Sequence, residues 1–201
     1  KNAGLAYAVQ SNVVPNMGLD GMISRLSRYC DLVVASQPYG KGRGPLQVSA
    51  LEASLFGTGA PILVIPPSSD SDYSRPFERV VVAWNESDED FAAIRKALPV
   101  LQAADRVDVV MVDPPSHSPE RSDPGGAICV MLARHGIKAE VSILSRTLPR
   151  VSEVMTRFAN DRDADLIVMG AYGHSRMREA ILGGATRDML EGAELPLLMA
   201  H

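Results

Sequence analysis

The sequence predicts an α/β protein built on an open, parallel, five-stranded, doubly wound sheet, in tandem with a partial copy of the same plan. Two observations carry this prediction. Apolar runs without polar alternation, typical of strands buried on both faces, alternate with amphipathic helical segments over residues 76–201. Residues 1–67 repeat the order of strands and helices of the second half of that region. We therefore divide the chain into a partial unit (1–67), a linker (68–75) and a complete unit (76–201).

Five apolar runs are the expected strands of the complete unit: residues 79–84, 107–112, 139–144, 166–169 and 197–199. The first helix is expected after Ser87, because Ser87 and Asp90 have the spacing of a capping box. Helical spacing predicts its buried face at Phe91, Ile94, Leu98 and Leu101. The second helix covers 128–134, and Gly136 stands where a left-handed residue commonly ends a helix. Helices three and four are expected around 151–158 and 185–191.

The partial unit matches only the second half of this plan. RLSRYCDLVVAS at 25–36 parallels residues 157–170, and EASLFGTGAPILVIPP at 52–67 parallels the C-terminal residues. A proline-, serine- and aspartate-rich stretch, typical of a linker, follows. Without a first strand, the fourth strand of this unit is predicted to present an open apolar edge, which folded proteins avoid. We therefore expect about 70 further residues, half of such a unit, ahead of Lys1 in the native polypeptide.

Composition and charge exclude several classes of protein. The sequence is 46% hydrophobic and 22% charged, as in ordinary globular proteins. Its net charge of −4 argues against nucleic-acid binding, which needs clustered positive charge. No apolar run approaches the roughly 20 residues that cross a membrane, and no signal peptide is visible. Cys30 and Cys129 show no disulfide or metal pattern, and both are expected as buried small apolar groups. These features favour a cytoplasmic protein without nucleic-acid or membrane partners.

Glycines follow the fourth strand of the complete unit. Gly170, Gly173 and the pair Gly183-Gly184 lie between strand 166–169 and the last helix. Glycine lets a backbone approach a ligand closely, and a helix N-terminus offers free amides and partial positive charge to phosphate. We therefore predict that main-chain N–H groups after Met169 face a hollow large enough for a triphosphate. The dinucleotide-binding and P-loop glycine patterns are both absent from the sequence.

The glycine spacing, G-x2-G-x9-G, lies within DADLIVMGAYGHSRMREAILGGATRDMLEGAELPLLMAH at 163–201. Spacing and flanking sequence resemble the ATP-binding loop and C-terminal signature of the universal stress protein family. The resemblance implies a stress-response protein that binds ATP or another adenine nucleotide and that regulates rather than catalyses. The positions that it implies for nucleotide binding are Gly170, Gly173, Gly183, Gly184, Asn85, Ala83, Met111 and, inside the loop, His174.

The same resemblance implies a mode of self-association. In the family, fifth strands pair across a two-fold interface. Here Pro61–Ile65 and Pro196–Met199 are short apolar candidates for that pairing. The pairing is expected either within one chain, as a pseudo-dimer, or between two chains as a homodimer.

Two departures from the family pattern leave a second function open. The family's nucleotide binders carry Ser or Thr after the last loop glycine and Asp at the end of strand one. This chain has Gly184 and Asn85 at those positions. The missing hydroxyl at Gly184 and the missing charge at Asn85 together weaken nucleotide binding by about 2–4 kcal/mol, or about 30- to 1000-fold in affinity. The alternative is a stress protein of the same fold that binds no nucleotide and acts as a dimerisation or protein-interaction module.

Catalytic motifs are absent from the sequence. There is no nucleophile elbow with an ordered Ser–His–Asp set, no H-E-x-x-H and no recognisable carboxylate pair. We therefore expect no enzyme activity beyond weak ATP hydrolysis, no catalytic residue and no metal site.

Overall fold

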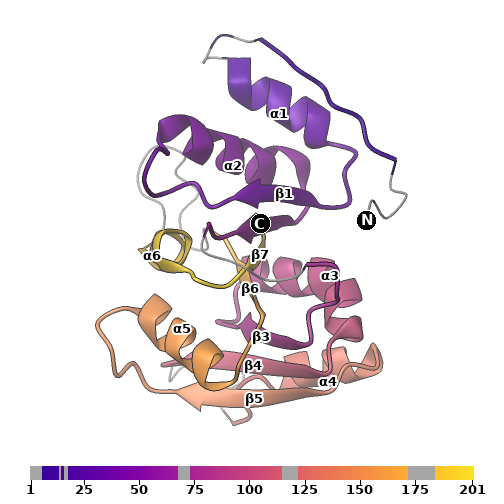
Figure 1. Ribbon diagram of the computed structural model, residues 1–201. Helices are drawn as coiled ribbons and strands as arrows, with labels where there is room; N and C mark the ends of the chain where they lie inside the picture. Colours follow the sequence, from indigo (N-terminus) through magenta and orange to yellow (C-terminus); the bar gives the residue numbers. More distant parts are fainter. Residues whose placement is uncertain (1–5, 14, 16–17, 68–72, 115–121, 172–183) are drawn as a thin grey trace.

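The computed structural model describes residues 6–13, 15, 18–67, 73–114, 122–171 and 184–201. One seven-stranded sheet runs through the molecule in the order β1-β2-β7-β6-β3-β4-β5 (Figure 1). The strands are β1 Val33–Ser36, β2 Ile62–Ile65, β3 Arg79–Ala83, β4 Arg106–Val112, β5 Ala139–Leu144, β6 Leu166–Gly170 and β7 Leu197–Ala200. The helices are α1 Leu19–Ser27, α2 Pro45–Thr58, α3 Asp88–Ala103, α4 Gly126–Arg134, α5 Val151–Asp161 and α6 Gly184–Gly192.

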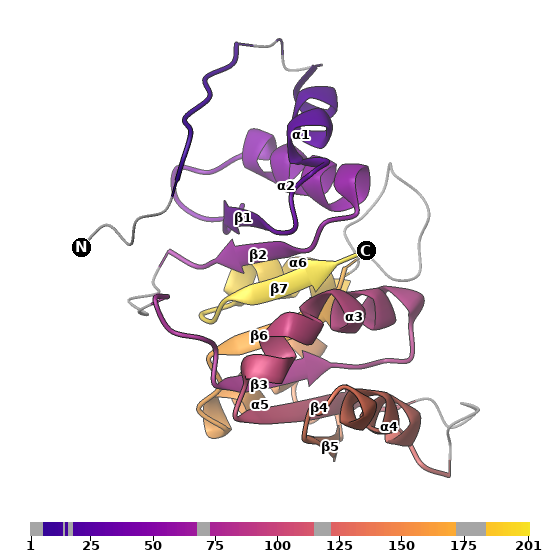
Figure 2. The ribbon, with the colours of Figure 1, turned by 90° about the vertical axis from the view of Figure 1, so that its right-hand side faces the viewer.

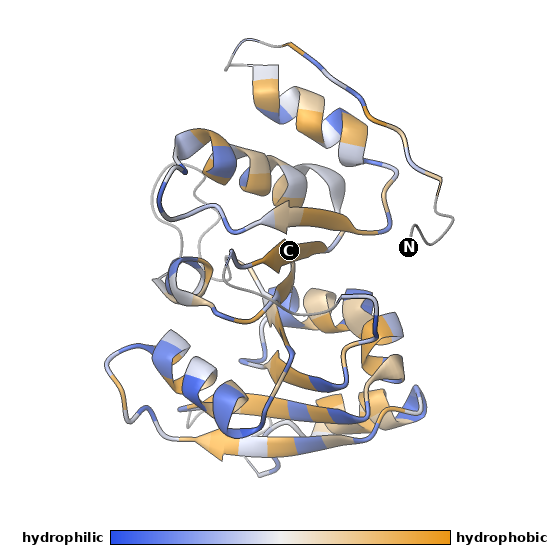
Figure 3. Cartoon of the chain, viewed as in Figure 1, coloured by the Kyte–Doolittle hydropathy of each residue, from blue (hydrophilic) through white to orange (hydrophobic). Residues whose placement is uncertain are grey.

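Five strands of this sheet, β7-β6-β3-β4-β5, are mutually parallel, which confirms the predicted fold class. Helices α5 and α6 cover one face of these strands, and α3 and α4 cover the other (Figures 1 and 2). The core is accordingly split into two apolar layers, one on each side of the sheet. Apolar residues are concentrated in the strands, as Figure 3 shows, because both strand faces are buried.

Strands β2 and β7 pair antiparallel within the chain, with Ile62 opposite Met199 and Val64 opposite Leu197. These are the two strands that the sequence predicts to pair, and the pairing occurs inside one polypeptide. Residues of α2 accordingly belong to the same apolar layer as residues of α5 and α6. Beyond β2, β1 forms an edge of the sheet, and Val34 there is 62% exposed.

Helix boundaries follow the local signals in the sequence. The hydroxyl of Ser87 accepts the amide of Asp90 at 3.2 Å and caps α3. The reciprocal half of the predicted capping box is wrong, because the carboxylate of Asp90 bonds elsewhere. Gly136 has a φ of 77°, in the left-handed region, as expected of a helix stop.

Two predictions about burial are wrong. Phe91 is 37% exposed, and the buried face of α3 consists of Asp90, Ala93, Ile94, Ala97 and Leu101. This face is rotated because the small residues Ala93 and Ala97 allow α3 to lie close to the sheet. Cys30 is exposed, because it lies in the short turn between α1 and β1 rather than in either element.

Candidate functional site

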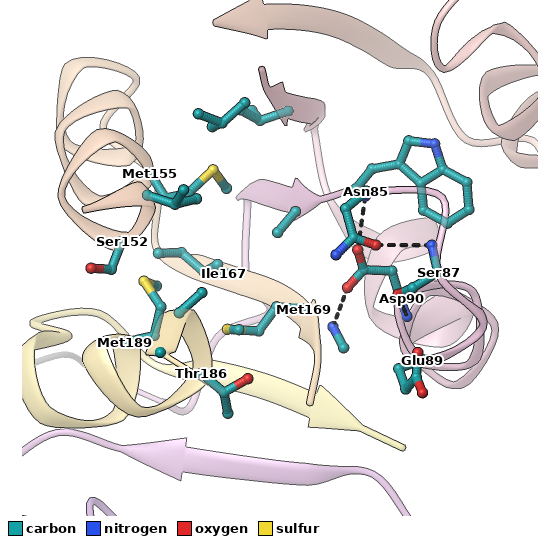
Figure 4. Close-up of a pocket in the computed structure, with 18 residues that line it drawn as sticks. Asn85, Ser87, Glu89, Asp90, Ser152, Met155, Ile167, Met169, Thr186 and Met189 are labelled. Atoms are coloured by element: carbon teal, nitrogen blue, oxygen red, sulfur yellow. Dashed lines mark hydrogen bonds between the residues drawn. The ribbon is translucent and has the colours of Figure 1, made fainter. Parts of the chain in front are cut away.

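A cavity of about 300 Å³ opens at the carboxyl ends of β3, β4 and β6 (Figure 4). Strands β3 and β6 are adjacent and parallel, but their chains continue to opposite faces of the sheet, to α3 and α6. This is the switch point of a doubly wound sheet, where such folds bind ligands. The cavity has an apolar part, formed by Ala83, Val110, Val112, Val151, Met155, Ile167, Met169 and Met189. Its polar part is formed by Asn85, Ser87, Glu89, Asp90, Gly170, Thr186 and neighbouring main chain.

The apolar part of the cavity follows from strand alternation. Side chains on β4 point alternately to the two faces, so Val110 and Val112 reach the cavity while Met111 does not. Met111 is 1% exposed and lies in the apolar layer under α3 and α4. Met111, one of the positions that the resemblance implies for nucleotide binding, therefore does not line this cavity. Ala83, by contrast, lines the cavity.

The carboxylate of Asp90 joins the ends of β3 and β6. Its Oδ1 accepts the amide of Gly170 at 2.7 Å, and its Oδ2 accepts the amide of Asn85 at 2.8 Å. Asp90 is 5% exposed, so both bonds lie away from bulk water. A Cβ at Gly170 would lie 2.5 Å from the Asp90 amide nitrogen. Gly170 thus permits the close approach of α3 to the strand end.

Main-chain donors after Met169 are engaged within the fold as far as the chain is described. The amide of Gly170 donates to Asp90, and the amide of Ala171 donates to the carbonyl of Ala200 at 2.9 Å. The expectation that these first amides face the hollow is therefore wrong. Gly173, His174 and Gly183 lie outside the described residues.

Asn85 also lines the cavity, and its side chain takes part in a local turn. The side-chain oxygen Oδ1 accepts the amide of Ser87 at 2.8 Å. The next residue, Glu86, has a φ of 66°, so the chain turns sharply between β3 and α3. The side-chain oxygen of Asn85, a position implied for nucleotide binding, therefore already accepts a hydrogen bond within this turn.

The first turn of α6 supplies the other polar wall. Gly184, Ala185 and Thr186 line the cavity, and the first N–H groups of a helix have no acceptor within the helix itself. A Cβ built at Gly184 meets no described atom within 4 Å. Thr186 is 6% exposed and faces the cavity from the α6 side (Figure 4). Of the described polar walls, this helix end suits an anion best.

Sequence reasoning missed most of the apolar wall and the role of Asp90. Met155, Met169 and Met189 come from α5, β6 and α6 and meet only in the folded chain. A helical or strand pattern indicates that each is buried, but not that they share a cavity. The spacing of Ser87 and Asp90 indicated a helix cap, and nothing in it pointed to Gly170.

Comparison with protein families decides the relationship of the chain. The model of the universal stress protein family matches residues 76–201. The chain belongs to the universal stress protein family. A 90-residue stretch is 31% identical to universal stress protein Slr1230 of Synechocystis, covering 45% of this chain and 30% of that protein. The chain thus spans less than a third of that relative.

Solved structures of the family share the fold. A universal stress protein from Archaeoglobus fulgidus superposes with a TM-score of 0.68 at 20% identity, over 90% of this chain and 66% of its own. A putative universal stress protein from Pseudomonas aeruginosa superposes with a TM-score of 0.59 at 16% identity, over 94% of this chain and 69% of its own. Identities at this level establish the architecture alone.

The described residues contain neither a candidate membrane-spanning helix nor a candidate metal site. None of their helices combines the length and apolarity that spanning a bilayer demands. Within the same ranges, no three His, Cys, Asp or Glu side chains come together as a metal site.

Proposed function

We propose that this universal stress protein binds ATP or a related adenine nucleotide in the cavity between β3 and β6, and that binding is regulatory rather than catalytic. The observation that carries the proposal is the pairing of an apolar pocket with the N-terminus of α6 at the switch point of the sheet. The apolar part suits a purine base, and the helix end suits a phosphate. The implied phosphate contacts of Gly173, Gly183 and His174 remain part of this proposal. In keeping with its composition, we place the protein in the cytoplasm.

The base is best held by the apolar residues of the cavity. Val110, Val112, Met155 and Met189 offer aliphatic and thioether surface on the side away from α3. Burying a flat base against such surface contributes about 25 cal/mol per Å² of apolar area. Three methionines allow adjustment to the ligand, because the unbranched thioether side chain has several accessible rotamers.

A second function is favoured by the engaged polar groups. The amides of Gly170 and Ala171 and the side-chain oxygen of Asn85 already have partners within the chain. The cavity therefore offers a ligand fewer main-chain hydrogen-bond donors than the glycine pattern predicts. The alternative is a protein-interaction module that does not bind nucleotide. Since β2 and β7 pair within the chain, further self-association would need a surface other than these strands.

Thermal unfolding with and without nucleotide separates the two functions. A ligand that binds only the native state raises the unfolding midpoint with its concentration. We expect millimolar ATP, ADP or AMP to raise the midpoint and to change the fluorescence of Trp84, the single tryptophan, which lines the cavity. If several millimolar of each nucleotide changes neither the unfolding midpoint nor the Trp84 fluorescence, the proposal of nucleotide binding is wrong and the interaction module is favoured.

A gain-of-function variant tests where the phosphate lies. Among the described residues, no atom lies within 4 Å of a Cβ added at Gly184, and a serine there restores the hydroxyl carried by nucleotide-binding relatives. We expect Gly184→Ser to tighten binding of phosphorylated nucleotides about tenfold, because a hydrogen bond to a charged group contributes about 1.5–3 kcal/mol. Gly184→Ala is the matched control, since it adds the Cβ without the hydroxyl. Equal affinities for the two variants would place the phosphate elsewhere.

A further inference from the structure

The polar wall of the cavity on the α3 side carries negative charge. Glu89 and Asp90 both line the cavity, and both come from the first turn of α3. Figure 4 shows them together on this side, opposite the α6 side with Thr186 and Met189. Among the described residues that line the cavity there is no Lys, Arg or His. The described walls therefore present two carboxylates and no cationic side chain to a ligand.

The position of one of these charges is fixed. Asp90 is 5% exposed, and each of its carboxylate oxygens accepts a main-chain N–H from the end of a strand. The side chain cannot turn toward solvent when a ligand enters without breaking both bonds. Asp90 also takes up donors at the ends of β3 and β6 that would otherwise be available to an anion. It thus acts as an internal anion at the switch point.

Glu89 has more freedom. It is half-buried and lines the cavity, and its ionised carboxylate can only accept hydrogen bonds. Such a group accepts hydrogen bonds from ribose hydroxyls and repels phosphate oxygens. Because the cavity is partly shielded from water, this repulsion is screened less than on an open surface.

We infer that Glu89 and Asp90 set the charge selectivity of the cavity, which takes a nucleoside or nucleoside monophosphate in preference to a triphosphate. The inference rests on the proposed function and names its ligand class. The apolar part holds the base, the α3 side accepts the hydroxyls of the ribose, and the first turn of α6 accommodates a single phosphate. Each further phosphate adds negative charge opposite two carboxylates and weakens binding.

This order of affinities is tested by titrating the protein with adenosine, AMP and ATP and following the fluorescence of Trp84. We expect adenosine and AMP to bind more tightly than ATP, and added salt to narrow the difference because it screens the repulsion. ATP as the tightest ligand would overturn the charge selectivity and leave nucleotide binding in place. Absence of binding by all three ligands would overturn the proposed function, and this inference with it.

Two variants isolate the contribution of Glu89. Glu89→Gln removes a carboxylate that lines the cavity, whereas Asp88→Asn removes the same charge from the adjacent, exposed residue, which does not line it. Both residues lie in the first turn of α3, so the two variants change the charge at the helix N-terminus equally. We expect Glu89→Gln to tighten ATP binding about threefold relative to adenosine, and Asp88→Asn to change this ratio less. Equal effects would show that Glu89 has no specific role, and circular dichroism verifies that both variants fold.

Discussion

At the scale of single residues, the carboxylate of Asp90 joins a strand end that lies 80 positions away in the chain. This contact exists because position 170 is glycine. We expect Gly170→Ala to lower the free energy of unfolding by about 2 kcal/mol, since overpacking in a tight contact costs about 1–3 kcal/mol. The added Cβ would lie 2.5 Å from the Asp90 amide nitrogen and 2.6 Å from the Glu89 carbonyl carbon, both of them main-chain atoms. Urea denaturation measures the loss.

Gly184→Ala is the control for this substitution. Its Cβ enters open space among the described residues, and alanine is favoured over glycine in a helix by about 0.5–1 kcal/mol. Unchanged or slightly increased stability is expected. If both variants lost the same stability, the contact of α3 with Gly170 would not be the cause.

At the scale of elements, α1 and α2 illustrate how burial of a charge affects stability. Burial raises the pKa of Glu52 on α2, and Asp20 on α1 raises it further. The folded state then binds this proton more tightly than the unfolded state, so stability falls as pH rises from about 4 through the raised pKa. Above that window the ionised carboxylate remains destabilising.

Glu52→Gln should therefore raise the unfolding midpoint at neutral pH and leave it unchanged below pH of about 4. The gain is expected to stay under about 1 kcal/mol, because Glu52 is only half-buried and water screens its charge. Thermal unfolding followed by circular dichroism at both pH values measures it. A gain of the same size at acid pH would mean that packing, and not charge, is responsible.

At the scale of the whole molecule, one sheet joins the N-terminal strands β1 and β2 to the five parallel strands through the pairing of β2 with β7. We expect the chain to unfold in a single transition, with far-UV circular dichroism and Trp84 fluorescence coinciding. Val64→Asp in β2, at a site 2% exposed, should lower both midpoints together, with a loss of more than about 3 kcal/mol in the free energy of unfolding. Ser36→Asp adds the same charge at an exposed position of β1 and should have little effect. If Val64→Asp left the midpoint of the Trp84 fluorescence transition unchanged, β2 and the strands around Trp84 would unfold independently.

Much of the architecture was open to prediction, because its signals are local. Apolar runs without polar alternation, helical spacing, glycine helix stops and the Ser87 cap each depend on residues a few positions apart. Every end of the five strands predicted within residues 76–201 lies within one residue of the observed end, and a helix was predicted at each of α3, α4, α5 and α6. The glycines after strand 166–169 predicted a hollow at the carboxyl end of that strand, and the cavity lies there, between the ends of β3 and β6.

The sequence by itself determined that apolar strands alternate with helices over residues 76–201 and that polar and glycine residues follow particular strands; the second, partial copy of the pattern stays a prediction. Only the tertiary structure decided what those residues do. In the folded chain the amide of Gly170 donates a hydrogen bond to Asp90, and Met111 points away from the cavity. Methionines from three elements meet in the cavity, and Cys30 is exposed. The physical reason is that periodicity specifies which face of an element is buried, whereas contacts between distant residues depend on how closely the elements pack.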